Sequence, residues 1–248
     1  MSEDRAEGDN AEAGQPAGPA ESREAEAEAA ASEPQRRSTH IDQGAVYAAV
    51  GASADPELLR FPPEGSTPYA HEVQLGSGAE RFLSASSTLM TWGAQRAVGI
   101  RVRDIEHGDG GQYAGVTFDE RGTPQPLADA EVQYGPDGEP FVMAGMVVTL
   151  HWPDSRTPRR FRVVYTIDEP RRAGFAWGAA DGEGVVGEEC FTVEHRDDDT
   201  VWAAVRGFIW APEGRFFNGK GKGALKKAMK ESRAQVAALV TGVLSAGA

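Results

Sequence analysis

Cysteine is nearly absent from this chain of 248 residues, in which Cys190 is the single example. One cysteine excludes an intramolecular disulfide and a metal site built from several thiolates. The five histidines are scattered, and no pair has the i, i+4 spacing that brings two imidazoles to one metal. We therefore expect no metal site. We also expect no nucleophilic role for Cys190, because the neighbouring carboxylates disfavour a thiolate.

Long apolar runs are missing as well, and none approaches the ~20 residues that a membrane-spanning helix requires. The acidic N-terminus lacks the apolar stretch that defines a signal peptide. The formal net charge of −13 opposes nucleic-acid binding through overall charge. We expect a cytoplasmic protein with no membrane span and no nucleic-acid partner. A basic stretch at residues 215–233 is a local exception whose role stays open, as does any protein partner.

Complete cofactor motifs are lacking too. Gly76 and Gly78 follow a strand pattern and precede a helix pattern, as the glycines of a phosphate-binding loop do. The third glycine of the dinucleotide motif and the Gly-Lys-Ser/Thr ending of a P-loop are absent. We therefore expect a tight turn at this position and no cofactor.

Residues 1–38 contain neither an aromatic nor a branched aliphatic side chain. Such a segment cannot bury enough apolar surface to offset its ordering entropy, about 1–2 kcal/mol per residue. We predict a disordered acidic tail over residues 1–38, with an arm that binds a partner as the alternative. The remaining residues, 39–248, are predicted to form a single α+β domain.

Two periodicities alternate along that domain. Phe82, Ala85, Leu89 and Trp92 recur at helical spacing and predict a helix over 79–97, with Ser77 as the N-cap of a capping box. Residues 45–51 form a short strand or an extended lead-in. Alternating patterns predict strands at 71–75, 100–105, 113–118, 142–152 and 201–210, and three more that start near residues 160, 174 and 188.

A long C-terminal helix over 223–244 would cover such an antiparallel sheet. Its apolar residues recur at helical spacing: Leu225, Met229, Val236, Leu239 and Val243. A sheet of this kind buries one face against another layer. These patterns predict an α+β helix-grip fold, in which a curved sheet wraps the terminal helix and encloses a cavity.

Several motifs in order carry a resemblance to a known family. They are Tyr47–Gly51, Gly76-x-Gly78-x-x-x-Phe82, Leu89–Trp92, Arg162-Val163-Val164-Tyr165, Gly174-Phe175-Ala176-Trp177-Gly178 and Gly187-Glu188-Glu189-x-Phe191. With this spacing, residues 45–240 resemble the domain-of-unknown-function (DUF) family nineteen-ninety, uncharacterised proteins of bacteria and plants. The resemblance implies no known substrate or reaction. Its relation to START-like helix-grip domains that bind hydrophobic molecules is a fold-level analogy.

The chain departs from the family pattern after its aromatic strand. The family's aromatic-Gly-Thr-Leu-Pro-Gly-His run corresponds to residues 177–183, where Ala179 replaces the threonine and Glu183 replaces the histidine. If the family performs chemistry with that histidine, this chain has lost it. A binding function would be less affected.

Glu188 and Glu189 are the best catalytic candidates, because paired carboxylates can divide acid and base roles. Neighbouring strand residues point to opposite faces, so only one of them can face a pocket. Glu189 has the parity of Phe191 and is the inward candidate, with an arginine as candidate partner. Arg206 would hold an acidic ligand group if its face lines a cavity, and would be solvated if that face lies outside.

The preferred function is binding of a small hydrophobic ligand between the sheet and the C-terminal helix. The candidate lining residues are Tyr165, Phe175, Trp177, Trp202 and Trp210. One alternative is an enzyme of the cyclase, lyase or hydrolase type that uses Glu189 and Arg206. Another is an interaction module whose aromatic residues fill a solid core. An apolar cavity favours binding, a charged cavity favours an enzyme, and a filled core favours interaction.

Deletion of residues 1–37 should leave the melting temperature essentially unchanged, because this segment has nothing bulky and apolar to pack on a core. Differential scanning calorimetry of the full and shortened chains tests this expectation. A drop of more than about 4 °C, on the order of 1 kcal/mol for a domain of this size, would show that the segment packs on the domain.

Overall fold

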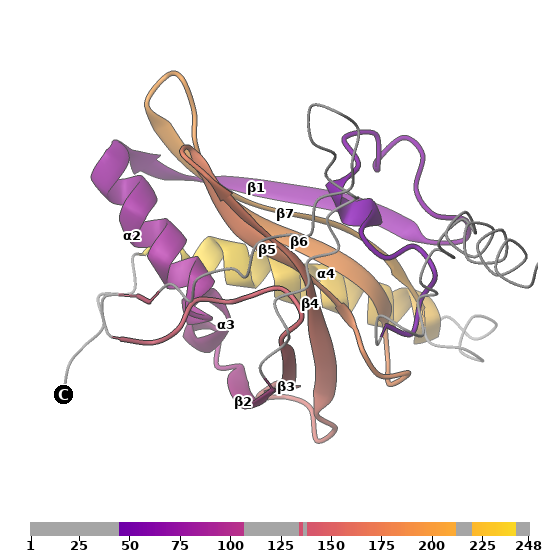
Figure 1. The fold of residues 1–248 in the computed structure, drawn as a ribbon. Coiled ribbons are helices and arrows are strands. Elements are labelled where there is room, and N and C mark those ends of the chain that lie inside the picture. Colours follow the sequence, from indigo (N-terminus) through magenta and orange to yellow (C-terminus); the bar gives the residue numbers. More distant parts are fainter. Residues whose placement is uncertain (1–44, 107–133, 136–137, 212–219, 242–248) are drawn as a thin grey trace, which may run out of the picture. The chain divides into compact units, whose positions relative to one another are not determined.

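Seven segments pair into one antiparallel sheet in the computed structural model, which describes residues 45–106, 134–135, 138–211 and 220–241 (Figure 1). The strand order is β1-β7-β6-β5-β4-β3-β2. The strands are β1 (Thr67–Ser77), β2 (Arg101–Glu106), β3 (Val147–His151), β4 (Arg159–Glu169), β5 (Arg172–Ala179), β6 (Val186–His195) and β7 (Thr200–Trp210). The helices are the 3-10 turn η1 (Ala52–Ala54), α2 (Ala79–Met90), α3 (Gly93–Ala97) and α4 (Lys220–Ala238).

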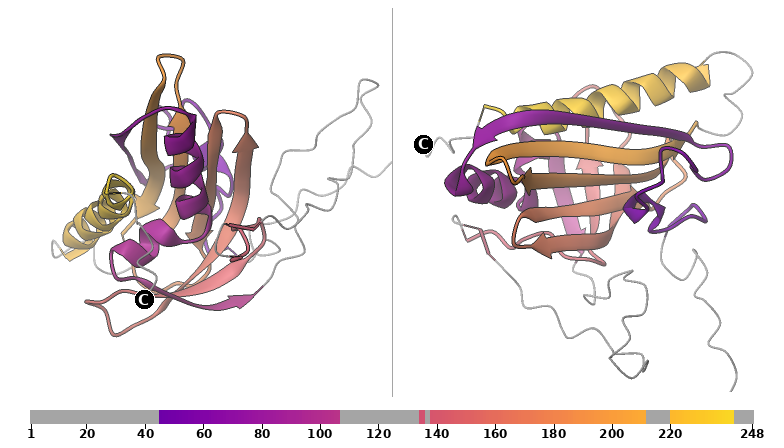
Figure 2. Two further views of the ribbon diagram at one scale, coloured as in Figure 1. Left: turned by 90° about the vertical axis from the view of Figure 1, so that its left-hand side faces the viewer. Right: turned by 90° about the horizontal axis from the view of Figure 1, so that it is seen from above.

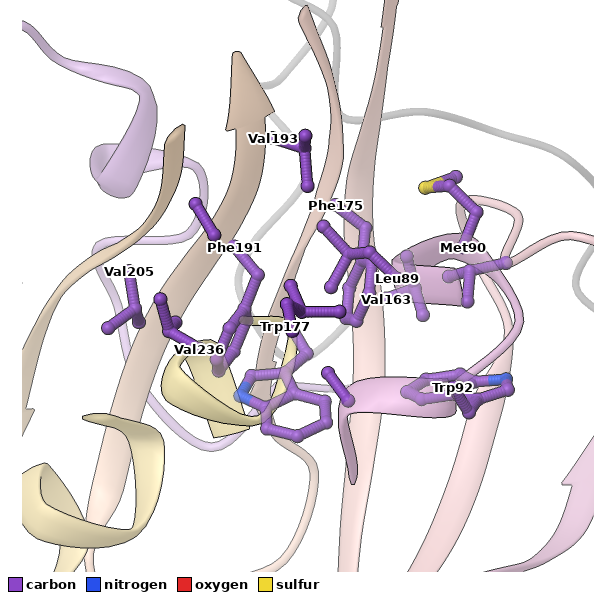
Figure 3. Close-up of a cluster of buried hydrophobic side chains, with 14 of the residues drawn as sticks. Leu89, Met90, Trp92, Val163, Phe175, Trp177, Phe191, Val193, Val205 and Val236 are labelled. Atoms are coloured by element: carbon purple, nitrogen blue, oxygen red, sulfur yellow. The ribbon is translucent and has the colours of Figure 1, made fainter. Parts of the chain in front are cut away.

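Three helices, α2, α3 and α4, cover the concave face of the curved sheet (Figure 2). Their apolar residues and the alternate residues of the strands form the inner core. Figure 3 shows Trp177 and Phe191 of the sheet gathered with Trp92 and with Val236 of α4. The predicted fold class, a curved antiparallel sheet that grips a C-terminal helix, is confirmed.

The opposite face of the sheet is covered by residues 45–58, which we call the lead-in segment. It contains η1 and no strand, although the backbone N–H of Val46 donates to the carbonyl of Ala179 at the end of β5. Tyr47 and Leu58 pack in a second buried cluster with Phe208 of β7. Both faces of the central strands are therefore buried, and Gly187–Val193 of β6 form a continuous buried run.

The single helix predicted over 79–97 is wrong, because the chain turns at Trp92. This residue has a φ of 63°, which lies in the left-handed region and separates α2 from α3. The predicted capping box is also wrong. Gly78, rather than Ser77, occupies the N-cap position of α2, and no side chain caps that end.

Two strand predictions also need correction. The strand predicted over 142–152 is shorter, since β3 covers Val147–His151. In β4 a bulge between Val163 and Tyr165 shifts the register against β5. Val163 consequently packs in the inner core while Tyr165 packs in the outer cluster, although simple alternation places both on one face.

The tail predicted over 1–38, the strand predicted over 113–118 and the helix residue Val243 lie outside the described residues. Of the helices that are described, none has the length and apolar composition needed to cross a membrane.

Leu239 follows α4 directly and is 2 % exposed, whereas its neighbour Val240 is 44 % exposed. Leu239→Ala should lower the free energy of unfolding by about 2–5 kcal/mol, because it leaves a cavity under the helix. Val240→Ala is the matched control and should change it by no more than about 0.5 kcal/mol. Urea denaturation measures both, and equal small losses would show that the C-terminal helix does not stabilise the sheet.

Candidate functional site

A cleft of about 340 Å³ lies between the concave face of the sheet and α4. One part of its lining is apolar and comes from the sheet, the preceding loops and the helix: Trp152, Phe161, Val186, Ile209, Ala224 and Ala228. The other part is polar or charged: Arg159, Glu183, Glu189, Lys227, Glu231 and Ser232. The helix-grip plan therefore provides a cavity, but its lining is mixed rather than apolar.

Glu189 lies on this lining at the middle of the sheet and is only 9 % exposed. Its Oε2 accepts a hydrogen bond of 2.8 Å from the indole N–H of Trp177. Its Oε1 accepts hydrogen bonds from the phenol of Tyr69 and from the hydroxyl of Ser232 on α4. The carboxylate thus joins three neighbouring elements of the inner face.

The strand register explains why these groups meet. Trp177 of β5, Glu189 of β6, Gly207 of β7 and Tyr69 of β1 lie on one rung across four strands. A Cβ on Gly207 would lie 3.2 Å from Cγ of Glu189 and 2.3 Å from the carbonyl oxygen of Glu188. The glycine therefore lets the carboxylate cross β7 and reach Tyr69. Burial, and then the charge of Glu189, raise the pKa of Tyr69, so that its phenol remains a donor.

The prediction that an arginine pairs with Glu189 is wrong. The groups that donate hydrogen bonds to this carboxylate are neutral: Tyr69, Trp177 and Ser232. Two cations do line the cleft, but each pairs with another carboxylate. Arg159 lies 3.1 Å from Asp181, and Lys227 lies 2.9 Å from Asp154. Among the described residues, no ion pair reaches Glu189.

Glu231 is a second carboxylate of the cleft and comes from α4. Its side chain is 29 % exposed and lies 3.5 Å from the Nζ of Lys227. Burial raises the pKa of Glu231, while Lys227 lowers it and the charges of Asp154 and Glu189 raise it further. Glu189 and Glu231 are therefore two carboxylates of one cleft in different surroundings.

Glu188 faces the other side of the sheet and is fully buried there. Its carboxylate accepts hydrogen bonds from the phenol of Tyr47 at 2.7 Å and from the backbone N–H groups of Gly51 and Ser53 at 2.8 and 2.9 Å. Tyr47 passes over Gly178, where a Cβ would lie 1.9 Å from its hydroxyl oxygen. Glu188 thus fastens the lead-in segment to the sheet and takes no part in the cleft.

Arg206 lies on the same outer face and does not share a site with Glu189. Its guanidinium donates to the carbonyl oxygens of Ser53 and Ala54 at 2.8 and 2.7 Å. It is neither a solvated surface cation nor the partner of an acidic ligand in the cleft. Its observed contacts hold the end of the lead-in segment.

The five aromatic residues expected to line one cavity are divided between the two faces. Phe175 and Trp177 belong to the inner core, and Tyr165 and Trp210 belong to the outer cluster. Trp202 is half-buried and its ring lies under the guanidinium of Arg196. Because the set does not converge, it does not form one ligand site.

Sequence reasoning missed Tyr69, Arg159, Glu231 and Ser232. One signal was available for the last of these. The apolar stripe of α4 runs from Leu225 to Val236, and Ser232 lies on it at a position where an apolar residue would be expected. A polar residue on the buried face of a helix indicates a polar partner on the sheet.

The structure defines a helix-grip α+β domain with a mixed cleft under its terminal helix. The chain belongs to the family described as Domain of unknown function (DUF1990), whose model matches residues 46–133 and 128–211. Glu183, which stands where the resemblance leads one to expect a histidine, lies on the lining of the cleft.

Solved structures resemble this chain at low identity. A hypothetical protein from Helicobacter pylori is 13 % identical with a TM-score of 0.46, over 75 % of this chain and 93 % of that chain. A protein from Nitrosospira multiformis is 10 % identical with a TM-score of 0.41, over 72 % and 97 %. Truncated norcoclaurine synthase from Thalictrum flavum is 9 % identical with a TM-score of 0.37, over 75 % and 99 %. No curated protein matches this chain.

Burial of Glu188 has a consequence for the pH dependence of stability. Burial raises the pKa of Glu188 in the folded state above its unfolded value of about 4.3. The stability that this group contributes is therefore fully present below about pH 4.3 and is lost as pH rises through the folded pKa. Urea denaturation over a pH series should show this loss in the wild type, and Glu188→Gln should remove it.

Glu57→Gln is the control for this measurement, since Glu57 is exposed on the lead-in segment. Its stability should follow the wild-type pH curve. If the Glu188→Gln curve also runs parallel to the wild type, Glu188 is not the group that titrates.

Proposed function

We propose that this protein binds a small ligand with a largely apolar body in the cleft between the sheet and α4. The observation that carries the proposal is the cleft itself, whose volume of about 340 Å³ lies within the range of small-molecule sites, roughly 300–1,000 Å³. Such sites combine apolar walls with a few placed polar groups. The lining of this cleft has that composition.

The apolar walls come from both layers. Trp152 and Phe161 form a tilted aromatic pair with ring centroids 5.8 Å apart, and Ile209 lies on the same lining. Ala224 and Ala228 face them from α4, four residues apart on one side of the helix. Because alanine side chains are small, this part of α4 leaves space above the sheet, whereas Val236 and Leu239 fill it farther along.

The polar end of the cleft supports a ligand with one polar group. Glu189 is held in place by Tyr69, Trp177 and Ser232, so its carboxylate does not need to reorganise when a ligand arrives. The apolar walls supply affinity through burial. The fixed carboxylate supplies orientation.

An enzyme that uses acid–base catalysis is the second candidate. Glu189 and Glu231 favour it, because two carboxylates with different surroundings face one cleft. Arg206 takes no part in this alternative, since it binds the lead-in segment on the other face. In an enzyme, Glu189→Gln would abolish turnover and leave binding of the ligand nearly intact.

A blocking substitution tests the binding function. Ala228→Trp should fill the cleft and weaken binding of a neutral apolar dye such as Nile red by about tenfold or more. A tenfold loss corresponds to roughly 1.4 kcal/mol of binding free energy, which the loss of buried apolar contact area can account for. Dye fluorescence measures the affinity. Ala237→Trp is the matched control, because Ala237 is exposed on the same helix. If wild-type protein binds no dye, or if both variants bind like the wild type, the cleft is not the ligand site.

A further inference from the structure

We infer that the ligand of the cleft carries a basic nitrogen, which binds as a cation between Glu189 of β6 and Glu231 of α4. The inference rests on the proposed function and names the chemical class of the ligand. Both carboxylates lie on the lining of the same cleft, one on the sheet side and one on the helix side. A cationic group in the cleft is thus reached from both layers.

The balance of charge around the cleft is negative. Its lining carries two cations, Arg159 and Lys227, and three carboxylates, Glu183, Glu189 and Glu231. Asp181 and Asp154, which pair with the two cations, raise the number of carboxylates to five. Lys227 lies 3.5 Å from Glu231 as well as 2.9 Å from Asp154. Among the described residues neither cation pairs with Glu189, and the three carboxylates outnumber the two cations on the lining.

Glu189 retains capacity for one more donor. An ionised carboxylate has about four acceptor positions, and three are filled by Tyr69, Ser232 and Trp177. These donors fix the carboxylate and stabilise it, but none of them carries a positive charge. An ammonium group supplies a fourth donor and a positive charge, and charge-assisted hydrogen bonds are stronger than neutral ones.

The lining discriminates against other ligand chemistries. A carboxylate or phosphate ligand would meet Glu183, Glu189 and Glu231 with the same sign of charge. A neutral ligand would fit the apolar walls but form no ion pair with Glu189. The aromatic ring of Trp152, which lines the same cleft, also attracts cations through its face.

The titration of Glu231 gives the inference a pH signature. The groups that face it are Lys227 on α4, Asp154 after β3 and Glu189 on β6, and burial raises its pKa. A cation binds the ionised form of Glu231. Affinity for an amine should therefore rise as pH increases through the titration of Glu231, and this rise should vanish in Glu231→Gln.

A matched series of ligands tests the inference: phenylbutylamine, phenylbutanol and phenylbutyrate share one apolar body and differ in the terminal group. Isothermal titration calorimetry at neutral pH should show the amine binding about tenfold or more tighter than the alcohol, as expected for a charge-assisted hydrogen bond. The carboxylate should bind more weakly than the alcohol. Glu231→Gln and Glu189→Gln should each reduce the preference for the amine by about tenfold.

Glu57→Gln is the control and should keep the full preference, because Glu57 is exposed on the lead-in segment. If Glu189→Gln does not fold, Glu231→Gln alone tests the inference. Its substitution should disturb the fold less, since Glu231 is partly exposed on α4. Equal affinity for amine and alcohol, or an unchanged preference in Glu231→Gln, would overturn the cationic ligand and leave the apolar binding site in place. If phenylbutylamine, phenylbutanol and phenylbutyrate all fail to bind, and Nile red does not bind either, both the cationic ligand and the proposed binding function are wrong.

Discussion

Two adjacent carboxylates on the interior strand β6 hold the two covering layers against the sheet. Glu188 accepts two backbone N–H groups of the lead-in segment on the outer face. Glu189 accepts the hydroxyl of Ser232 and so fastens α4 on the inner face. Since neighbouring residues of a strand point to opposite faces, one dipeptide serves both layers. Both carboxylates are satisfied by hydrogen bonds, as buried polar groups must be.

The contacts of each carboxylate also depend on a glycine in the adjacent strand, because a glycine has no side chain to block them. Gly178 of β5 makes room for Tyr47 to reach Glu188, and Gly207 of β7 makes room for Glu189 to reach Tyr69. The two tyrosines play the same part on opposite faces, because burial and the nearby carboxylate raise the pKa of both phenols and keep them protonated donors. The outer arrangement is closed by the lead-in segment, whereas the inner one borders the cleft.

The strands and the terminal helix were predictable because their periods survive in the sequence. The parity rule also placed Glu189 correctly on the inner face. The lead-in segment was not recognised as a cover, since an irregular segment has no period that reveals what it contacts. Simple alternation assigns Tyr165 to the inner face together with Val163. That assignment is wrong because a bulge beside Val163 reverses the alternation, and no residue there signals a bulge. Two of the three partners of Glu189, Tyr69 and Ser232, come from β1 and α4, which only the tertiary fold brings together with β6.

The cleft and the attachment of α4 share one group, and this links binding to the fold. Ser232 and Trp177 hold the carboxylate of Glu189 at the border of the cleft, and Ser232 belongs to the helix that forms the opposite wall. A ligand that compensates the charge of Glu189 therefore acts on the same group that keeps the helix on the sheet. Binding to the folded state alone adds stability as ligand concentration rises above its dissociation constant. Glu231 lines the same cleft, but its ion pair with Lys227 is partly exposed. A substitution of Glu231 should therefore change ligand binding with less effect on the stability of the fold.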